Sequence, residues 1–160
     1  MTSGGPVGIL LIDDNTLAGD SLGRWALRQP GRVRWLGFTS DCAAAPALVA
    51  ERQPDAVLLD IDIPGVDTFA LVERLLAIRP TLRVLMFSGH VRREYIDRSA
   101  EAGAMGYIVK DESPKDIVAL VERAVAGEFV LSRTVQGLIR HRAESAGNPA
   151  PAQRPMFIPR

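Results

Sequence analysis

Cysteine, lysine and long apolar runs are scarce in this sequence. Cys42 is the single cysteine, which excludes a disulfide framework and a cysteine-based metal site within the 160 residues. No run approaches the roughly 18 consecutive apolar residues of a transmembrane helix, so no membrane span is expected. The first six residues lack a basic region followed by an apolar core, so no signal peptide is expected either. A cytoplasmic protein of about one globular domain is the default prediction.

Lysine is scarce although positive charge is not. Of the 19 basic residues, 17 are arginine, and only Lys110 and Lys115 are lysine. Basic and acidic residues balance over the whole chain, which argues against a protein that coats nucleic acid. The balance is uneven, because residues 1–126 have a formal charge of −3 and residues 127–160 a charge of +3.

Five short apolar runs alternate with segments of helical length. The runs are continuous rather than alternating, which is typical of strands buried on both faces of a parallel sheet. They span Val7–Ile12, Val33–Gly37, Ala56–Leu59, Val84–Phe87 and Gly106–Val109. Helical periodicity lies between them, and Ser113 before Pro114 is typical of a helix N-cap. The pattern predicts an α/β fold with parallel strands, right-handed crossovers and helices on both faces.

The two ends of the chain lack this alternation. Residues 1–6 are expected to form a disordered N-terminus, and residues 7–126 the folded domain. After Gly127, residues 134–142 could form one short basic helix. Residues 146–160 contain four prolines and predict a mobile segment rich in proline and alanine.

Polar side chains follow four of the five predicted strands. In an open parallel sheet, function concentrates at the carboxyl ends of the strands. The residues there are Asp13 and Asp14, Asp60 and Asp62, Ser88, and Lys110. Clustered carboxylates repel one another, whereas Mg²⁺ binds carboxylate oxygens together with water and phosphate. Each residue alone could be a helix cap or a solvated side chain, but together they suit an aspartyl nucleophile for a phosphoryl group.

Four motifs carry a resemblance to a known family. They are Leu11-Ile12-Asp13-Asp14, residues 54–65 (PDAVLLDIDIPG), residues 84–89 (VLMFSG) and residues 103–110 (GAMGYIVK). In order and spacing the sequence resembles the receiver domain of two-component response regulators over residues 7–126. The resemblance implies a flavodoxin-like, doubly wound, five-stranded parallel sheet with the strand order 2-1-3-4-5.

The resemblance also implies a role for each polar residue. Asp60 would accept a phosphoryl group from a sensor histidine kinase or a phosphotransfer protein. The side chains of Asp14 and Asp60 would ligate Mg²⁺, with the backbone carbonyl of Asp62, and Asp13 would act through water. Lys110 would pair with the phosphoryl group, and Ser88 would donate a hydrogen bond to it.

Two further roles concern what happens after Asp60 is phosphorylated. Ser88 and Tyr107 would form the coupled switch that converts a local charge change into a surface change. Residues 90–126 would be the surface that controls a partner or a homodimer. Asp62 and His90 lie two residues after Asp60 and Ser88, and we expect them to tune self-dephosphorylation.

The sequence departs from the subfamily that it most resembles, whose members carry a C-terminal helix-turn-helix. Residues 133–160 are too few for such a domain and contain no recognition-helix pattern, so direct DNA binding is not expected and the effector is unknown. A smaller departure is Thr68, which stands where the family usually has glycine before the third helix.

Two alternatives remain open. A receiver-like interaction domain that never cycles phosphate would share these motifs. A haloacid-dehalogenase-type phosphatase would share the Asp-x-Asp pattern at Asp60 and Asp62, but that family places its nucleophile on the first motif strand, whereas here the pair Asp13-Asp14 comes first. The preferred prediction is a signalling phosphoacceptor and not an enzyme.

Overall fold

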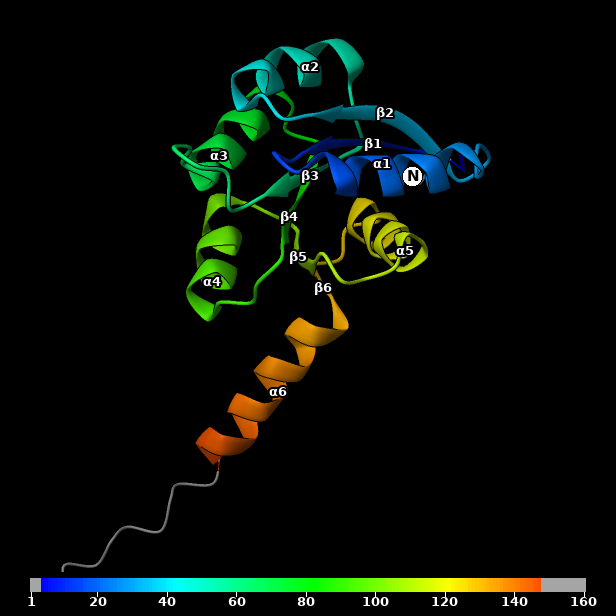
Figure 1. Cartoon of the computed structure of the whole chain (residues 1–160). Helices are drawn as coiled ribbons and strands as arrows, with labels where there is room; N and C mark the ends of the chain where they lie inside the picture. The colour runs from blue at the N-terminus through cyan, green and yellow to red at the C-terminus, as the bar shows by residue number, and fades with distance from the viewer. Residues whose placement is uncertain (1–3, 148–160) are drawn as a thin grey trace, which may run out of the picture.

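The computed structural model describes residues 4–147 and shows a six-stranded, all-parallel sheet in the order β2-β1-β3-β4-β5-β6 (Figure 1). The strands are β1 (Val7–Ile12), β2 (Val33–Thr39), β3 (Ala56–Asp60), β4 (Arg83–Ser88), β5 (Gly106–Val109) and β6 (Val130–Leu131). The helices are α1 (Thr16–Leu27), α2 (Ala45–Arg52), α3 (Thr68–Ile78), α4 (Arg93–Ala102), α5 (Pro114–Val125) and α6 (Arg133–Gly147), with a 3₁₀ turn at Cys42–Ala44. The predicted α/β class, the strand order 2-1-3-4-5 and the parallel pairing are confirmed.

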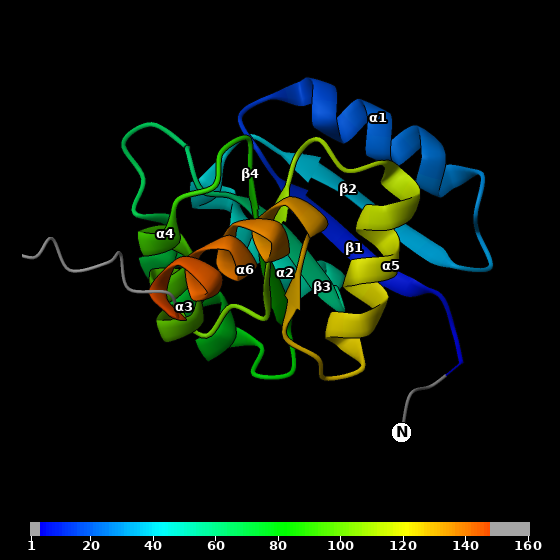
Figure 2. The same ribbon diagram turned by 90° about the horizontal axis from the view of Figure 1, so that it is seen from below.

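Helices cover both faces of the sheet (Figure 2). Alternate strand residues point into two hydrophobic clusters, because side chains along a strand face opposite sides. One cluster joins the sheet to α2, α3 and α4, and the other joins it to α1 and α5. All five residues of β3 are buried, which agrees with the continuous apolar run in the sequence.

Local signals in the sequence match the observed helix starts. The Ser113 side chain accepts a hydrogen bond from the backbone of Asp116, so it caps α5 as predicted. Thr68, at the position where glycine was expected, begins α3 and is almost fully buried. Its hydroxyl donates to the carbonyl of Ile61, which ties the start of α3 to the loop after β3.

The sixth strand was not expected. Val130 and Leu131 pair in parallel with Gly106 and Tyr107. Gly106 permits this approach, because a Cβ atom at this position would lie 2.6 Å from Cγ2 of Val130. The sheet therefore continues beyond residue 126.

The helix after β6 is longer than expected. The predicted helix covered residues 134–142, whereas α6 runs from Arg133 to Gly147. Its start lies against the sheet, and its far end projects away from the body (Figure 1). The predicted mobile segment lies mostly outside the described residues, as do residues 1–3 of the predicted disordered N-terminus. Between Gly4 and Gly147, no helix is long and apolar enough to cross a membrane.

Candidate functional site

The predicted polar residues gather at the carboxyl edge of the sheet. Asp13 follows β1, Asp60 ends β3, Ser88 ends β4 and Lys110 follows β5. These four strands are consecutive neighbours in the sheet, so their ends lie side by side. The topology thus brings together residues that are up to 97 positions apart in the sequence.

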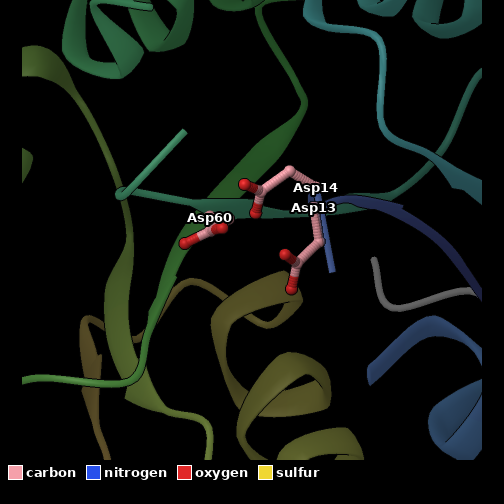
Figure 3. Close-up of side chains that lie close together, drawn as sticks. All are labelled: Asp13, Asp14 and Asp60. Carbon is pink, nitrogen blue, oxygen red and sulfur yellow. The ribbon is translucent and has the colours of Figure 1, made fainter. Parts of the chain in front are cut away.

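Three carboxylates form the floor of the site (Figure 3). Asp13, Asp14 and Asp60 each offer an oxygen, and these oxygens lie within 4.8 Å of one another. Asp13 is fully buried and Asp60 is 2% exposed, whereas Asp14 is exposed. Backbone amides orient the two buried groups, because Asn15 N donates to Asp13 Oδ1 and Asp62 N donates to Asp60 Oδ1.

Lys110 supplies the positive charge inside the cluster. Its Nζ lies 2.8 Å from Asp13 Oδ2 and 3.4 Å from Asp60 Oδ2. Burial lowers the pKa of Lys110, but the two carboxylates outweigh this effect and the net pKa is raised. The ammonium therefore stays charged and can attract a phosphoryl group as a compact countercharge.

The surroundings of Asp60 bring the pKa of its carboxyl group close to neutral pH. Burial is the main cause that raises the pKa of Asp60 to about 7, and the neighbouring Asp13 adds to it. The amide of Asp62 opposes the rise. A cation bound to the cluster would favour the ionised, nucleophilic form of this carboxyl group.

The cluster fits a hard divalent cation. Asp13 Oδ2 is buried, and the Lys110 ammonium lies 2.8 Å from it. Three converging carboxylate oxygens match the oxygen ligands that Mg²⁺ prefers. The predicted ligands Asp13, Asp14 and Asp60 lie together as this chemistry requires.

Hydrogen bonds link the predicted switch residues. The Ser88 hydroxyl lies 3.4 Å from Asp62 Oδ2, to which it donates, and Ser88 Oγ accepts from His90 N. The carbonyl of His90 accepts a 2.6 Å hydrogen bond from the Tyr107 hydroxyl. Tyr107 is fully buried, and this burial raises its pKa. All four predicted residues of this group therefore lie in one connected path.

A cavity of about 620 Å³ opens above the carboxylates. Asp62, His90 and Lys110 line it, together with Asp14 and Asp60. The lining also includes Asn15, Thr16 and Gly89, which the sequence did not identify as site residues. Asn15 could have been noted from its place after Asp14, since its side chain caps α1 by accepting from Leu17 N.

The fold and the site define a class of flavodoxin-like α/β proteins with an acidic pocket at the strand ends. The chain belongs to the response regulator receiver domain family, whose sequence profile matches residues 9–122. It is 29% identical over 135 residues to the nitrate/nitrite response regulator protein NarL of Escherichia coli K12, covering 84% of this chain and 62% of that protein.

Two further similarities point the same way. The chain is 31% identical over 150 residues to the transcriptional regulatory protein MctR of Rhizobium johnstonii, covering 93% of this chain and 70% of that one. Its structure superposes on the signal receiver domain of NarL from Mycobacterium tuberculosis with a TM-score of 0.70 and 30% identity, covering 78% of this chain and 99% of that chain. The chain thus spans less than two thirds of the length of the Escherichia coli relative.

Membership of this family argues against one of the two alternative functions. Receiver domains are signalling switches of two-component systems rather than classical enzymes. The haloacid-dehalogenase-type phosphatase is therefore not supported, and the order of the acidic motifs already argued against it.

Proposed function

We propose that the chain is a phosphoacceptor switch in which Asp60 takes a phosphoryl group from a phosphohistidine. The donor is a sensor histidine kinase or a phosphotransfer protein, as the family implies. The observation that carries this proposal is the buried Asp60 carboxylate facing the Lys110 ammonium at 3.4 Å, beside two further carboxylates. A phosphoryl acceptor needs a nucleophile, a countercharge and a means to neutralise the neighbouring carboxylates.

The positions of these groups support a direct transfer. A carboxylate oxygen of Asp60 attacks phosphorus, the phosphorus–nitrogen bond of the phosphohistidine breaks, and its electron pair returns to the imidazole nitrogen. An acyl phosphate results on Asp60. Lys110 Nζ, already held between Asp13 and Asp60, pairs with the added negative charge.

Mg²⁺ is the proposed cofactor, and when bound it neutralises the carboxylates and the phosphoryl oxygens. Asp14 and Asp60 would hold it by their side chains, Asp62 by its backbone carbonyl and Asp13 through water. The clustering of Asp13, Asp14 and Asp60 supports this assignment.

The switch proposal rests on the hydrogen-bonded path from Asp62 to Tyr107. Ser88 would leave Asp62 and donate to the phosphoryl group on Asp60. Because Ser88 Oγ also accepts from His90 N, this movement would displace the carbonyl that Tyr107 donates to. The surface of residues 90–126 would change with it.

Asp62 and His90 are proposed to tune the lifetime of the acyl phosphate. Both line the cavity above Asp60, where a hydrolytic water would approach. A His90→Ala variant is expected to change the half-life of the phosphorylated protein, followed by loss of radiolabel. An unchanged half-life would remove His90 from this role.

The partners and the output are proposals as well. A homodimer through residues 90–126 and a downstream effector of unknown kind follow from the family. The relatives include a transcriptional regulatory protein, so control of transcription is an output to test. We do not expect residues 133–160 to bind DNA by themselves. We assign the receiver to residues 7–126 and expect it to act in the cytoplasm. Beyond residue 126, β6 and Val135 add to its sheet and its core, so we treat this part of residues 127–160 as joined to the receiver.

The decisive experiment is incubation with Mg²⁺ and acetyl phosphate, followed by mass spectrometry. The wild-type chain should gain one phosphoryl group, and Asp60→Ala should gain none. Asp97→Ala, at an exposed position on α4, is the matched control and should react like wild type. If the wild-type chain forms no adduct with any small donor, the non-cycling interaction domain becomes the better explanation.

A further inference from the structure

Ser132, the residue before α6, and Arg133, the first residue of the helix, are tied to β5 and to the loop that follows it. Ser132 N donates to the carbonyl of Tyr107 at 3.1 Å, and Ser132 Oγ accepts from Val109 N at 3.2 Å. The next amide, Arg133 N, donates to Glu112 Oε1 at 3.1 Å. We call residues 132–136 the base of α6. These bonds join the base to the residues on both sides of Lys110.

The base is part of the hydrophobic core. Ser132 is 1% exposed, and Val135 is fully buried in the same cluster as Tyr107 and Val109. β6 ends at Leu131, so the backbone ladder stops before the end of β5. The Ser132 hydroxyl takes over at this point and gives the Val109 amide an acceptor inside the core, where an amide without one would be costly. After β6, α6 projects away from the body (Figure 1).

We propose that Ser132 is a positioning residue for Lys110, and that through it the base of α6 responds to the state of Asp60. The proposal rests on the phosphoacceptor function above. Val109, which Ser132 holds, is the residue directly before Lys110. A phosphoryl group on Asp60 gives the Lys110 ammonium a stronger and more fixed partner, which orders the end of β5. An ordered Val109 amide then favours the bond to Ser132 and the docked base.

The coupling is reciprocal by thermodynamic necessity. If the phosphorylated state favours the docked base, then the docked base favours the phosphorylated state by the same factor. The response of α6 thus needs no direct contact with the phosphoryl group, because ordering at one end of a short strand lowers the cost of ordering at the other.

The test compares amide hydrogen exchange by NMR in the full chain, with and without Mg²⁺ and beryllofluoride, a phosphoryl analogue. In the wild-type chain the ligand should slow exchange of the Val109, Arg133 and Gln136 amides by about fivefold. In Ser132→Ala the slowing at Arg133 and Gln136 should disappear, and beryllofluoride should bind about fivefold more weakly.

Ser145→Ala is the matched control, because the Ser145 hydroxyl bonds only within α6, to the carbonyl of His141. It should behave like wild type. Glu112→Ala changes an exposed bond to the base and should halve the response, which keeps the proposal testable if Ser132→Ala does not fold. Beryllofluoride binding without any change in α6 exchange would overturn this proposal and leave the phosphoacceptor function intact. Absence of binding to the wild-type chain would overturn both.

Discussion

The pocket at the strand ends and the base of α6 lie next to the same short strand, β5, yet they have opposite effects on the stability of the fold. In the pocket, Asp13, Asp60 and Lys110 are charged groups withdrawn from water, which is costly unless they are neutralised. At the base, Val135 packs in the core and neutral hydrogen bonds are satisfied. The comparison indicates that the pocket is arranged for binding a charged group and the base for fixing structure.

Substitution of Asp60 should change the free energy of unfolding the most. An unfolded aspartate loses its proton near pH 4, whereas the folded group holds its proton until its pKa of about 7. The unfolded state therefore binds fewer protons in this window, and without a divalent cation the free energy of unfolding should fall as pH rises from 4 to 7. Asp60→Asn should remove this fall and be more stable than wild type at pH 8 by on the order of 3 kcal/mol.

Urea unfolding at pH 5 and pH 8 in the presence of a chelator checks this prediction. Asp97→Asn, on the surface of α4, should leave the pH dependence as it is. Equal stability of Asp60→Asn and wild type at pH 8 would contradict the statement that the pocket opposes folding.

Substitution of Val135 should lower the free energy of unfolding, whereas substitution of Asp60 should raise it. Val135→Ala removes buried methyl groups from the base of α6 and should lower the free energy of unfolding by about 2 kcal/mol. The loss should be similar at pH 5 and pH 8, since no titrating group is changed. Leu138→Ala, at a position on α6 that is 39% exposed, should cost far less in the same urea series. A Val135→Ala variant as stable as wild type would mean that the base does not support the fold.

Gln136 should contribute less than Val135. Its side-chain amide donates to the carbonyl of Leu131 at 2.7 Å, which holds the turn from β6 into α6. Gln136→Ala should cost about 1 kcal/mol, the usual net contribution of one partly buried hydrogen bond. Thermal unfolding monitored by circular dichroism can resolve this difference, with exposed Thr134→Ala as the control for a change in helix propensity.

The ion pair between Arg123 and Glu128 should matter least. Its atoms are 2.8 Å apart, but both side chains are more than half exposed. Arg123→Ala should change the free energy of unfolding by less than about 0.5 kcal/mol, and the change should shrink further in high salt. An effect as large as that of Val135→Ala would contradict the expectation that the exposed ion pair contributes less to stability than the buried Val135 side chain.

The sequence predicted which residues gather at one edge of the sheet, because these residues follow the ends of strands. Continuous apolar runs located five strands to within about two residues, and parallel topology then placed Asp13, Asp60 and Lys110 together. The pairing of Ser88 with Asp62 depends on side-chain orientation, which no spacing rule gives. The sequence therefore indicated which residues lie together but not the hydrogen bonds between them.

Other features of the fold, beginning with β6, leave no recognisable pattern in the sequence. β6 has two residues, too few to show a period, and its pairing depends on the absence of a side chain at Gly106. The bond from Val109 to Ser132 joins segments 23 residues apart and follows from that pairing alone. For the same reason, no pattern in the sequence indicates that Val135 belongs to the core rather than to a separate appendage.

The two outer strands of the sheet also affect how copies of this chain meet at high concentration. An exposed, long and flat edge strand invites a second chain to add to the sheet and begin aggregation. On one side the edge is β2, which is interrupted by a bulge near Gly37 and has its Leu36 carbonyl occupied by Arg52. On the other side the edge is β6, only two residues long. Neither side offers a continuous ladder of free backbone groups, so β6 shields the longer β5 from edge-to-edge polymerisation.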